Sequence, residues 1–345
     1  MAALLSAFIS GCAGEALTAE EWRFFQDVRP SGLILFRRNC RTPEQVGALV
    51  NAFKDAVGSD NVLVLVDQEG GRVQRLAPPH WRKLPAAACY GTLYDEDPDR
   101  AKRAAQIASQ LVALDLRTLG INANCAPVLD VPVEGADQAI GDRAYSSDLE
   151  AVIALGRAVA NGLLQGGVLP VMKHLPGHGR ASVDSHRALP IIEAPLATLR
   201  AVDFVPFRAL ADLPIAMSAH VMLTEVDRYG PATTSAKVID TIIRGEIGFD
   251  GLLLSDDMSM AALGGSPAER AEAILAAGCD IALHCNGRLD EMREVAASAG
   301  MLEGRAEERF EAALARRAPA APFDASEALA ALELAHSVEP RQTKA

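Results

Sequence analysis

The sequence predicts a (β/α)8 barrel of the TIM type, and three observations lead to this prediction. Eight short apolar runs of strand length alternate with helix-length stretches along the 345 residues. The runs are almost continuously hydrophobic, which is typical of parallel strands buried on both faces. No GxGxxG turn follows the first run, although such a turn would favour the competing doubly wound open sheet. Eight strands in a chain of roughly 250 to 400 residues fit the usual barrel.

The first predicted strand, Ala7–Ser10, lies in an apolar stretch from Leu4 to Cys12 that a signal peptide could also contain. A signal peptide needs positive charge before its apolar part. The first basic residue is Arg23, so we expect a buried strand here. The other predicted strands are Gly32–Phe36, Val62–Val66, Asn122–Val128, Leu169–Met172, Ile215–Ser218, Gly251–Ser255 and Cys279–Leu283.

Amphipathic stretches of helical length separate these strands. The first begins after Thr18-Ala-Glu-Glu, because Thr followed three residues later by Glu forms a capping box. The predicted helices are Ala19–Gln26, Pro43–Ala56, Asp99–Leu119, Leu149–Gly166, Leu196–Ala211, Ser235–Ile247, Pro267–Ala277 and Arg288–Ala297.

The end of the chain differs in composition from the rest. From Pro319 onward, Pro- and Ala-rich sequence leads to one more helix, Ala325–His336, and to a polar tail. No Gly/Ser linker divides the chain, so we expect a single domain with an appended C-terminal helix. The predicted boundaries are 1–318 for the barrel and 319–345 for the helix and a mobile tail.

Composition excludes several classes of protein. Hydrophobic residues make up 50% and charged residues 23%, which is typical of a globular protein. The 45 acidic against 33 basic residues give a net charge of −12, which argues against nucleic acid as a partner. No apolar run approaches the roughly 20 residues that span a bilayer. The six cysteines form no CxxC pair, so we expect reduced thiols and a cytoplasmic location.

Polar residues follow the ends of the predicted strands, where barrel enzymes carry their chemistry. Because these ends meet at one rim, we expect the side chains to converge. They are Asp67 after the third strand, Asn124 and Asp130 after the fourth with Arg143 in its long loop, Lys173 and His174 after the fifth, His220 after the sixth, and Ser255, Asp256 and Asp257 after the seventh.

The loop after the fifth strand contains a candidate acid/base pair. In an extended segment residues i and i+2 point the same way, so Asp184 can bond the imidazole of His186. Such a carboxylate orients a histidine for proton transfer. Gly177 and Gly179 would let this loop move. His178, on the same loop, fits a solvated side chain equally well.

The pair Asp256–Asp257 follows an apolar strand. Asp257 fits the N-cap of a helix beginning at Met258, which leaves Asp256 free to face a pocket. There it could act as a nucleophile, a general base or a metal ligand.

Three mechanisms use these residues. A metal-dependent hydrolase would bind its ion through His174, His220 and Asp256, but the chain has no HExxH pair. A Schiff-base lyase would need a neutral Lys173, whereas neighbouring carboxylates would keep it charged. A glycosidase would use Asp256 as nucleophile and a second group as proton donor. The glycosidase uses all of the polar rim residues.

These residues also form motifs of a known family. KHLPGHG with DSH (Lys173–His186) and LLLSDDMSM resemble the family 3 glycoside hydrolases, in particular the single-domain bacterial β-N-acetylhexosaminidases. The resemblance covers roughly residues 5–300, and Leu175 stands where Phe is usual. Further matching segments are DQEGGRVQRL (67–76), GLILFRRN (32–39), APVLDV (126–131), IGDRAYSSD (140–148), MSAHVM (217–222) and PATTSAKVI (231–239).

The resemblance implies a barrel that hydrolyses glycosides with retention through a covalent glycosyl-enzyme. By motif matching, Asp256 corresponds to the nucleophile, His186 to the acid/base and Asp184 to its partner. Substrate-binding positions fall on Asp67, Arg75, Arg143, Lys173 and His174. An imidazole, with an ordinary pKa near 6.5, suits proton donation at neutral pH.

The resemblance further implies removal of terminal N-acetylglucosamine from anhydro-muropeptides in peptidoglycan recycling, and so a role in cell-wall biogenesis, cell shape and the cell cycle. We expect a cytoplasmic monomer that acts on a small carbohydrate, with no cofactor, no metal and no membrane partner. The alternatives are the metal-dependent barrel hydrolase and a non-catalytic sugar-binding barrel.

Overall fold

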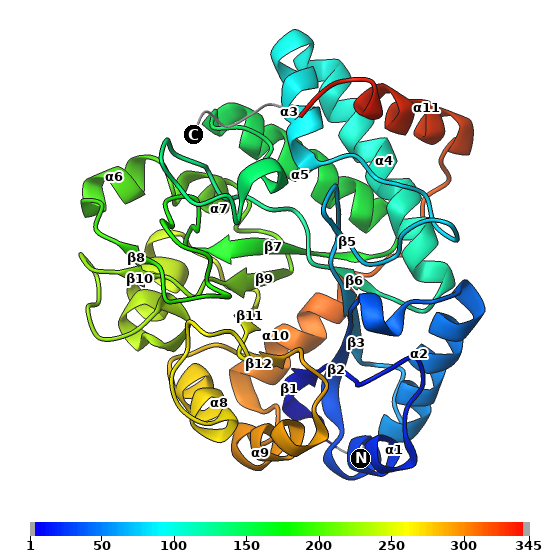
Figure 1. Cartoon of the computed structure of the whole chain (residues 1–345), viewed down its shortest axis with the longest axis vertical. Coiled ribbons are helices and arrows are strands. Elements are labelled where there is room, and N and C mark those ends of the chain that lie inside the picture. Colours follow the sequence, from blue (N-terminus) through cyan, green and yellow to red (C-terminus); the bar gives the residue numbers. More distant parts are fainter. Residues whose placement is uncertain (1–3, 341–345) are drawn as a thin grey trace.

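The computed structural model describes residues 4–340, and within them eight parallel strands close into a barrel surrounded by helices (Figure 1). The predicted fold class is therefore confirmed. The barrel strands are β1 (Ser6–Ser10), β2 (Pro30–Leu35), β3 (Leu63–Val66), β6 (Ala123–Asn124), β7 (Leu169–Leu175), β9 (Ile215–Ser218), β11 (Leu252–Asp257) and β12 (Ile281–His284). Around the barrel they follow the order β1-β12-β11-β9-β7-β6-β3-β2.

Side chains alternate between the inside and the outside of the barrel, as strand geometry requires. On β1, Ile9 joins the cluster inside the barrel, whereas Phe8 packs between the barrel and the helices. The stretch from Leu4 to Cys12 thus contains the buried strand expected of it. Both faces of each strand are apolar for this reason, and the continuous hydrophobic runs of the sequence follow from it.

The helices cover the outside of the barrel. The first of them begins with the predicted capping box, because the backbone N–H of Glu21 donates to Thr18 Oγ1 at 3.1 Å and the Glu21 carboxylate accepts from the N–H of Thr18 at 2.8 Å. The helices are α1 (Ala19–Val28), α2 (Pro43–Val57), α3 (Ala87–Glu96), α4 (Pro98–Thr118), α5 (Leu149–Gln165), α6 (Leu196–Ala201), α7 (Val205–Ala209), α8 (Pro267–Ala276), α9 (Leu289–Ala299), α10 (Gly304–Ala315) and α11 (Ala325–His336), with 3-10 turns η1 (Arg37–Asn39), η2 (Gly141–Arg143) and η3 (Ala232–Thr234) and a π-helix η4 (Val238–Glu246).

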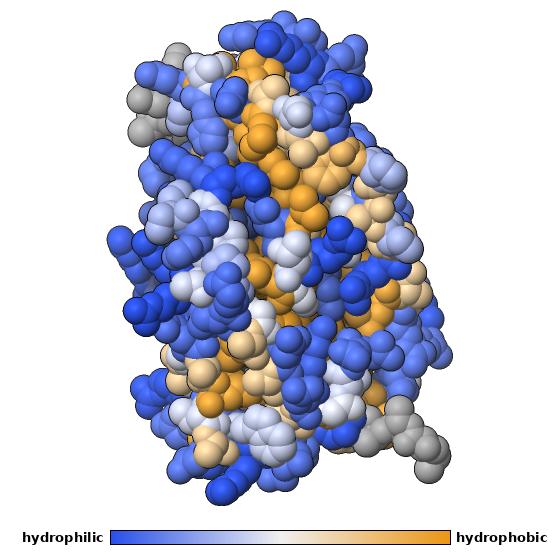
Figure 2. All heavy atoms as spheres, turned by 90° about the vertical axis from the view of Figure 1, so that its right-hand side faces the viewer, coloured by the Kyte–Doolittle hydropathy of each residue, from blue (hydrophilic) through white to orange (hydrophobic). Residues whose placement is uncertain are grey.

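Two of these helices lie at the C-terminal end of the chain and have different roles. α10, which the sequence analysis missed, closes one end of the barrel with Phe310 and Ala313. α11 has the predicted bounds and packs against α4 (Figure 1). Figure 2 shows the face that lies to the right in Figure 1, where apolar side chains form a broken band between charged ones. The last residues of the predicted mobile tail, 341–345, lie outside the described residues.

Two predicted elements were too long. The fourth strand was predicted as Asn122–Val128, but β6 ends at Asn124, because Pro127 lacks a ladder N–H and restricts the residue before it. The helix predicted as Leu196–Ala211 is divided into α6 and α7. Pro206 explains this break, since its ring would clash with the carbonyl of Val202 in a continuous helix.

Two small sheets lie above the barrel at its carboxyl end. β4 (Gln68–Gly70) and β5 (Val73–Gln74) form an antiparallel hairpin directly after β3. β8 (Ile191–Ile192) and β10 (Met222–Leu223) pair in parallel between the loops after β7 and β9. Among the helices of residues 4–340, none has the length and apolar character needed to cross a membrane.

Candidate active site

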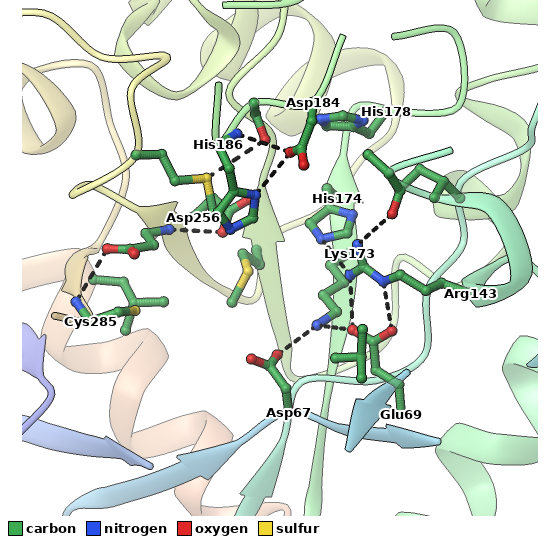
Figure 3. Close-up of a pocket in the computed structure, with 18 of the residues that line it drawn as sticks. Asp67, Glu69, Arg143, Lys173, His174, His178, Asp184, His186, Asp256 and Cys285 are labelled. Atoms are coloured by element: carbon green, nitrogen blue, oxygen red, sulfur yellow. Dashed lines mark hydrogen bonds and ion pairs between the residues drawn. The ribbon is translucent and has the colours of Figure 1, made fainter. Parts of the chain in front are cut away.

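The carboxyl ends of the barrel strands surround a cavity of about 260 Å³ (Figure 3). All eight site residues expected from the sequence line this one cavity. They are Asp67, Arg75, Arg143, Lys173, His174, Asp184, His186 and Asp256. Other lining residues include Phe36, Glu69, His178, Met217, Met260, Leu283 and Cys285.

The alternation of the strands explains why three of these charged residues meet. On each of the three strands β3, β7 and β11, two apolar side chains point into the barrel, and the next side chain on the same face is charged. At that level the barrel opens into the cavity, so the charge reaches the pocket floor. The inward series are Leu63, Leu65 and Asp67 along β3, Leu169, Val171 and Lys173 on β7, and Leu252, Leu254 and Asp256 on β11.

Lys173 lies on the floor between two carboxylates, with only 2% of its side chain exposed. Its Nζ is 2.8 Å from Asp67 Oδ1 and 2.6 Å from Glu69 Oε1. Burial lowers the pKa of Lys173, but the negative charges of Asp67 and Glu69 raise it more. The pKa of Lys173 therefore lies above its ordinary value. A charged amine has no free electron pair, so the Schiff-base hypothesis is not supported.

Two arginines extend this ion-pair network. Arg75 donates to Asp67 Oδ2 at 2.8 Å. Arg143 contacts both oxygens of Glu69, through Nε at 2.8 Å and Nη2 at 2.9 Å. Burial raises the pKa of Glu69, but Arg143 and Lys173 lower it more, to about 2. The network is therefore ionised at neutral pH, and it holds cationic N–H groups at the edge of the cavity.

His174 is oriented by a buried carboxylate. Its Nδ1 lies 2.6 Å from Asp130 Oδ2, and Asp130 is fully buried. A proton on Nδ1 is shared with this carboxylate, so Nε2 is left as the acceptor facing Arg143 Nη2 at 3.4 Å. Burial raises the pKa of Asp130, but His174 and the backbone N–H of His178 hold it below its ordinary value.

Asp256 is buried at the end of β11, with 8% of its surface exposed. Burial alone would raise its pKa, but the effects of His174, His220, the backbone N–H of Asp257 and Lys173 together outweigh burial. The N–H of Asp257 donates to Asp256 Oδ1 at 2.8 Å. The pKa of Asp256 is therefore lower than usual, and the carboxylate stays ionised as a nucleophile requires.

Asp184 and His186 contact each other as predicted, but through a turn and not an extended segment. Asp184 Oδ1 accepts from the backbone N–H of His186 at 3.0 Å and lies 2.9 Å from its Nδ1. The carbonyl of Asp184 accepts from the N–H of Arg187, which closes the turn. The imidazole of His186 is 66% exposed and borders the same cavity as Asp256 (Figure 3).

The loop that carries His186 has an anchored first part. Gly179 packs directly on Val131, where an added Cβ would lie 1.9 Å from the Val131 carbonyl oxygen. Arg180 forms an ion pair with the buried Asp203 at 2.7 Å. Gly179 therefore serves close packing, and the freedom of movement expected of it from the sequence is wrong. The movement of the loop stays a prediction.

Two other histidines, His178 and His220, are buried. His178 is buried, and its backbone N–H donates to Asp130 at 2.6 Å, so it is not a solvated side chain. Both ring nitrogens of His220 have partners, Thr233 Oγ1 at 2.9 Å and the carbonyl of Asp257 at 3.0 Å. The side chains of the hypothetical metal ligands His174, His220 and Asp256 thus do not form a common ligand group. Residues 4–340 contain no group of three or more His, Cys, Asp and Glu side chains arranged to hold a metal.

The role expected of Asp257 was wrong, and the site residue Glu69 was missed. No helix begins at Met258, because β11 continues to Asp257. Asp257 accepts instead from the backbone N–H groups of Ser259 at 2.9 Å and Cys285 at 3.2 Å, and so it stabilises the turn after the strand. Glu69 was missed because it lies on β4, a strand of only three residues after β3, which the apolar pattern does not show. The spacing of Asp67 and Glu69, two residues apart, was the signal available.

We expect the Asp130→Asn variant to be less stable by about 2 kcal/mol at pH 7, because a buried acceptor of charge-assisted hydrogen bonds is lost. Asp130 has a depressed pKa in the folded state. Its stabilisation is present above the unfolded pKa of about 3.9 and is lost as the pH falls through the folded value. Denaturant unfolding from pH 7 to pH 2 should show the two proteins converging below about pH 4.

The exposed Asp60 provides the control for this variant. Asp60→Asn should unfold like the wild type at every pH. A constant difference between Asp130→Asn and the wild type down to pH 2 would show that the carboxylate charge is not involved.

Comparison with known proteins agrees with this geometry. Residues 12–318 match the family described as glycosyl hydrolase family 3 N terminal domain. The β-hexosaminidase of Alkalilimnicola ehrlichii is 41% identical over 287 residues, which cover 82% of this chain and 81% of that protein. The β-hexosaminidase of Bordetella parapertussis is 40% identical over 278 residues, 79% of this chain and 78% of that one.

Solved structures have the same fold. A family 3 β-N-acetylglucosaminidase from Paenibacillus superposes with a TM-score of 0.85 at 28% identity and matches 96% of this chain, but this chain covers only 66% of that protein. NagZ from Neisseria gonorrhoeae, in complex with N-trifluoroacetyl-D-glucosamine, has a TM-score of 0.78 at 33% identity and covers 91% of this chain and 97% of its own. A structure of NagZ in complex with a zinc ion superposes with a TM-score of 0.77 at 32% identity, over 91% of this chain and 97% of that one.

Proposed function

The chain belongs to glycosyl hydrolase family 3 and is a glycoside hydrolase of the β-hexosaminidase type; we propose that it is a retaining exo-β-N-acetylglucosaminidase. One observation carries the proposal. An ionised carboxylate, Asp256, and a histidine backed by a carboxylate, His186, line one cavity of sugar size. The cationic side chains of Lys173 and Arg143 line the same cavity.

In the first step, Asp256 attacks the anomeric carbon of the sugar. The bond between this carbon and the glycosidic oxygen breaks as the bond to the Asp256 oxygen forms. His186 donates its proton to the departing oxygen, so that the aglycone leaves as an alcohol. The lowered pKa of Asp256 keeps the attacking group ionised.

In the second step, water attacks the same carbon from the side that the aglycone left. His186 takes a proton from this water, and the Asp256 carboxylate is released. Two inversions give net retention. Asp184, bonded to Nδ1 of His186 at 2.9 Å, directs Nε2 toward the reacting oxygen in both steps.

The polar floor of the cavity binds the sugar hydroxyls. The sugar-binding residues are Asp67, Arg75, Arg143, Lys173 and His174. The charged N–H groups of Arg75, Arg143 and Lys173 donate to hydroxyl oxygens, and the oxygens of Asp67 accept from hydroxyl hydrogens. These bonds hold the ring with its anomeric carbon toward Asp256.

The proposal is tested with chromogenic glycosides. The protein should release 4-nitrophenol from the N-acetyl-β-glucosaminide at least about 100-fold faster than from the β-glucoside, because a site built to bond a substrate group rejects the analogue that lacks it. Binding of N-acetylglucosamine without turnover would favour the non-catalytic sugar-binding barrel.

We further propose that the natural substrates are anhydro-muropeptides, cleaved by a cytoplasmic monomer during peptidoglycan recycling. The cavity is closed below by the ion-pair network and open beside the exposed His186, which suits removal of a terminal sugar from a bulky aglycone. Incubation with purified anhydro-muropeptides should yield free N-acetylglucosamine by mass spectrometry. Cleavage of internal bonds in a longer glycan would contradict the exo assignment.

Chelation is expected to leave activity unchanged. Lys173 and Arg143 place two positive charges at the cavity and occupy the carboxylates of Asp67 and Glu69, which disfavours binding of a divalent cation there, and neither step above involves a metal. Because a solved relative holds zinc, activity after exhaustive chelation separates an essential ion from a dispensable one. Activity lost on chelation and restored by zinc would favour the metal-dependent hydrolase.

A further inference from the structure

Glu69, like Asp67, is an acidic residue at the cavity that contacts two cations. It lies on β4 with 5% of its side chain exposed. Its Oε1 lies 2.6 Å from Lys173 Nζ. It also contacts Arg143, with Oε1 2.9 Å from Nη2 and Oε2 2.8 Å from Nε. A single carboxylate therefore connects two cations from different parts of the barrel, β7 and the turn η2.

The backbone around Glu69 is adapted to this position. Gly70 has a φ of +103°, and a Cβ there would lie 2.1 Å from the carbonyl oxygen of Pro85. Only glycine fits this close approach. The tight hairpin of β4 and β5 thus fixes the backbone of Glu69 over the floor of the cavity.

We propose that Glu69 is a positioning residue for sugar binding, which holds Lys173 and Arg143 so that their remaining N–H groups face the sugar. This inference rests on the proposed function, since it takes Lys173 and Arg143 as sugar ligands. Glu69 acts through these two residues and not as a ligand of its own.

The donor count on Lys173 supports this role. An ammonium group has three N–H donors. Asp67 and Glu69 take two of them, at 2.8 Å and 2.6 Å. With these two directions fixed, the tetrahedral geometry determines where the third N–H points.

The same argument applies to Arg143, whose guanidinium has five N–H donors. Two of them bond Glu69. Contacts of Nη1 with the carbonyl of Ala139 at 3.2 Å and of Nη2 with His174 at 3.4 Å take two more. The bidentate pair with Glu69 fixes the plane of the guanidinium, and one N–H on Nη1 remains for a ligand.

Charge balance gives a second reason for a carboxylate at this position. Arg75, Lys173 and Arg143 face only Asp67 and Glu69 within the ion pairs of the floor. Replacement of Glu69 by a neutral amide turns an acceptor oxygen into a donor that faces a cation. Lys173 and Arg143 then have to separate, and the sugar loses two oriented ligands.

A double-mutant cycle tests the proposal on the full-length protein. Glu69→Gln should raise both the KM for the chromogenic N-acetylglucosaminide and the inhibition constant of N-acetylglucosamine by about 10-fold to 100-fold, with kcat changed far less, because ground-state binding is lost. Glu69→Asp, which keeps the charge but reaches less far, should lie between Gln and the wild type. Glu311→Gln, on the exposed side of α10, is the matched control and should behave as the wild type.

The decisive comparison is made in an Arg143→Ala background. If Glu69 acts through Arg143 and Lys173, adding Glu69→Gln there should change the inhibition constant by a smaller factor than in the wild type. Only the effect through Lys173 is then left, and residues that act through one another are not additive. If the two substitutions raise the inhibition constant independently, so that their factors multiply in the double variant, the inference is overturned. A Glu69→Gln variant with unchanged KM, or a loss confined to thermal stability in both Glu69 variants, would overturn it as well.

The measurements on the wild-type protein test the proposed function alone. A wild type that neither binds N-acetylglucosamine nor cleaves its glycosides would overturn that function, and this inference with it. If the wild type is active and the effects of Glu69→Gln and Arg143→Ala on the inhibition constant multiply, only the inference on Glu69 is overturned.

Discussion

Replacement of Asp256 by Asn is expected to lower kcat by at least about 10⁴-fold, as found when a catalytic nucleophile is removed. The amide cannot form the glycosyl-enzyme, so the covalent step is lost. The fold should persist, because Asn keeps an oxygen that accepts the N–H of Asp257, the bond now made at 2.8 Å. Turnover of the chromogenic N-acetylglucosaminide measures the loss, and thermal unfolding checks the fold.

Asp257→Asn is the matched control. Its carboxylate stabilises the turn by accepting from Ser259 and Cys285, and an amide oxygen can do the same. We expect activity within about threefold of the wild type, since neutral hydrogen bonds replace charge-assisted ones at a modest cost. The reverse result, with Asp256→Asn active and Asp257→Asn inactive, would show that the nucleophile was assigned to the wrong member of the pair.

His186→Ala is expected to affect poor leaving groups far more than good ones. Protonation assists the departure of a sugar alkoxide, whereas 4-nitrophenolate leaves without it. The loss should be about 10²-fold to 10⁴-fold with an N-acetylglucosaminyl disaccharide and less than about tenfold in the first step with the activated phenol. Pre-steady-state release of the phenol measures this step separately from hydrolysis of the intermediate.

Asp184 variants provide the graded control for this prediction. Asp184→Ala removes the acceptor at 2.9 Å from His186 Nδ1 and should show the same pattern more mildly, because the imidazole remains but is no longer oriented. Asp184→Asn keeps an oxygen acceptor and should lie closer to the wild type. Equal losses with good and poor leaving groups would assign His186 to substrate binding or structure.

The eight strands were predictable because burial on both faces leaves a continuous apolar run for each. The same regularity brought Asp67, Lys173 and Asp256 together, since each continues a series of two inward-facing apolar side chains on β3, β7 and β11. The contact of Asp184 with His186 was also predictable, because it joins residues two apart in the chain. The geometry that produces it, a turn closed at Arg187, was not.

Features that depend on tertiary contacts were beyond the reach of the sequence pattern. Glu69 lies on a hairpin of two very short strands, and its partners Lys173 and Arg143 are more than seventy residues away along the chain. Asp130 was recognised as a polar residue after the fourth strand, but its buried bond with His174 at 2.6 Å depends on how that loop folds back. α10 has an ordinary amphipathic sequence, and only the structure shows that Phe310 closes the barrel.

Proton NMR of the first product formed tests the central claim most directly. The protein is incubated with 4-nitrophenyl N-acetyl-β-glucosaminide, and the anomeric signals of N-acetylglucosamine are followed from the first minutes, before mutarotation mixes them. A double displacement on Asp256 predicts that the β-anomer appears first and the α-anomer only later. Initial release of the α-anomer would mean direct attack by water, and would contradict a covalent intermediate on Asp256.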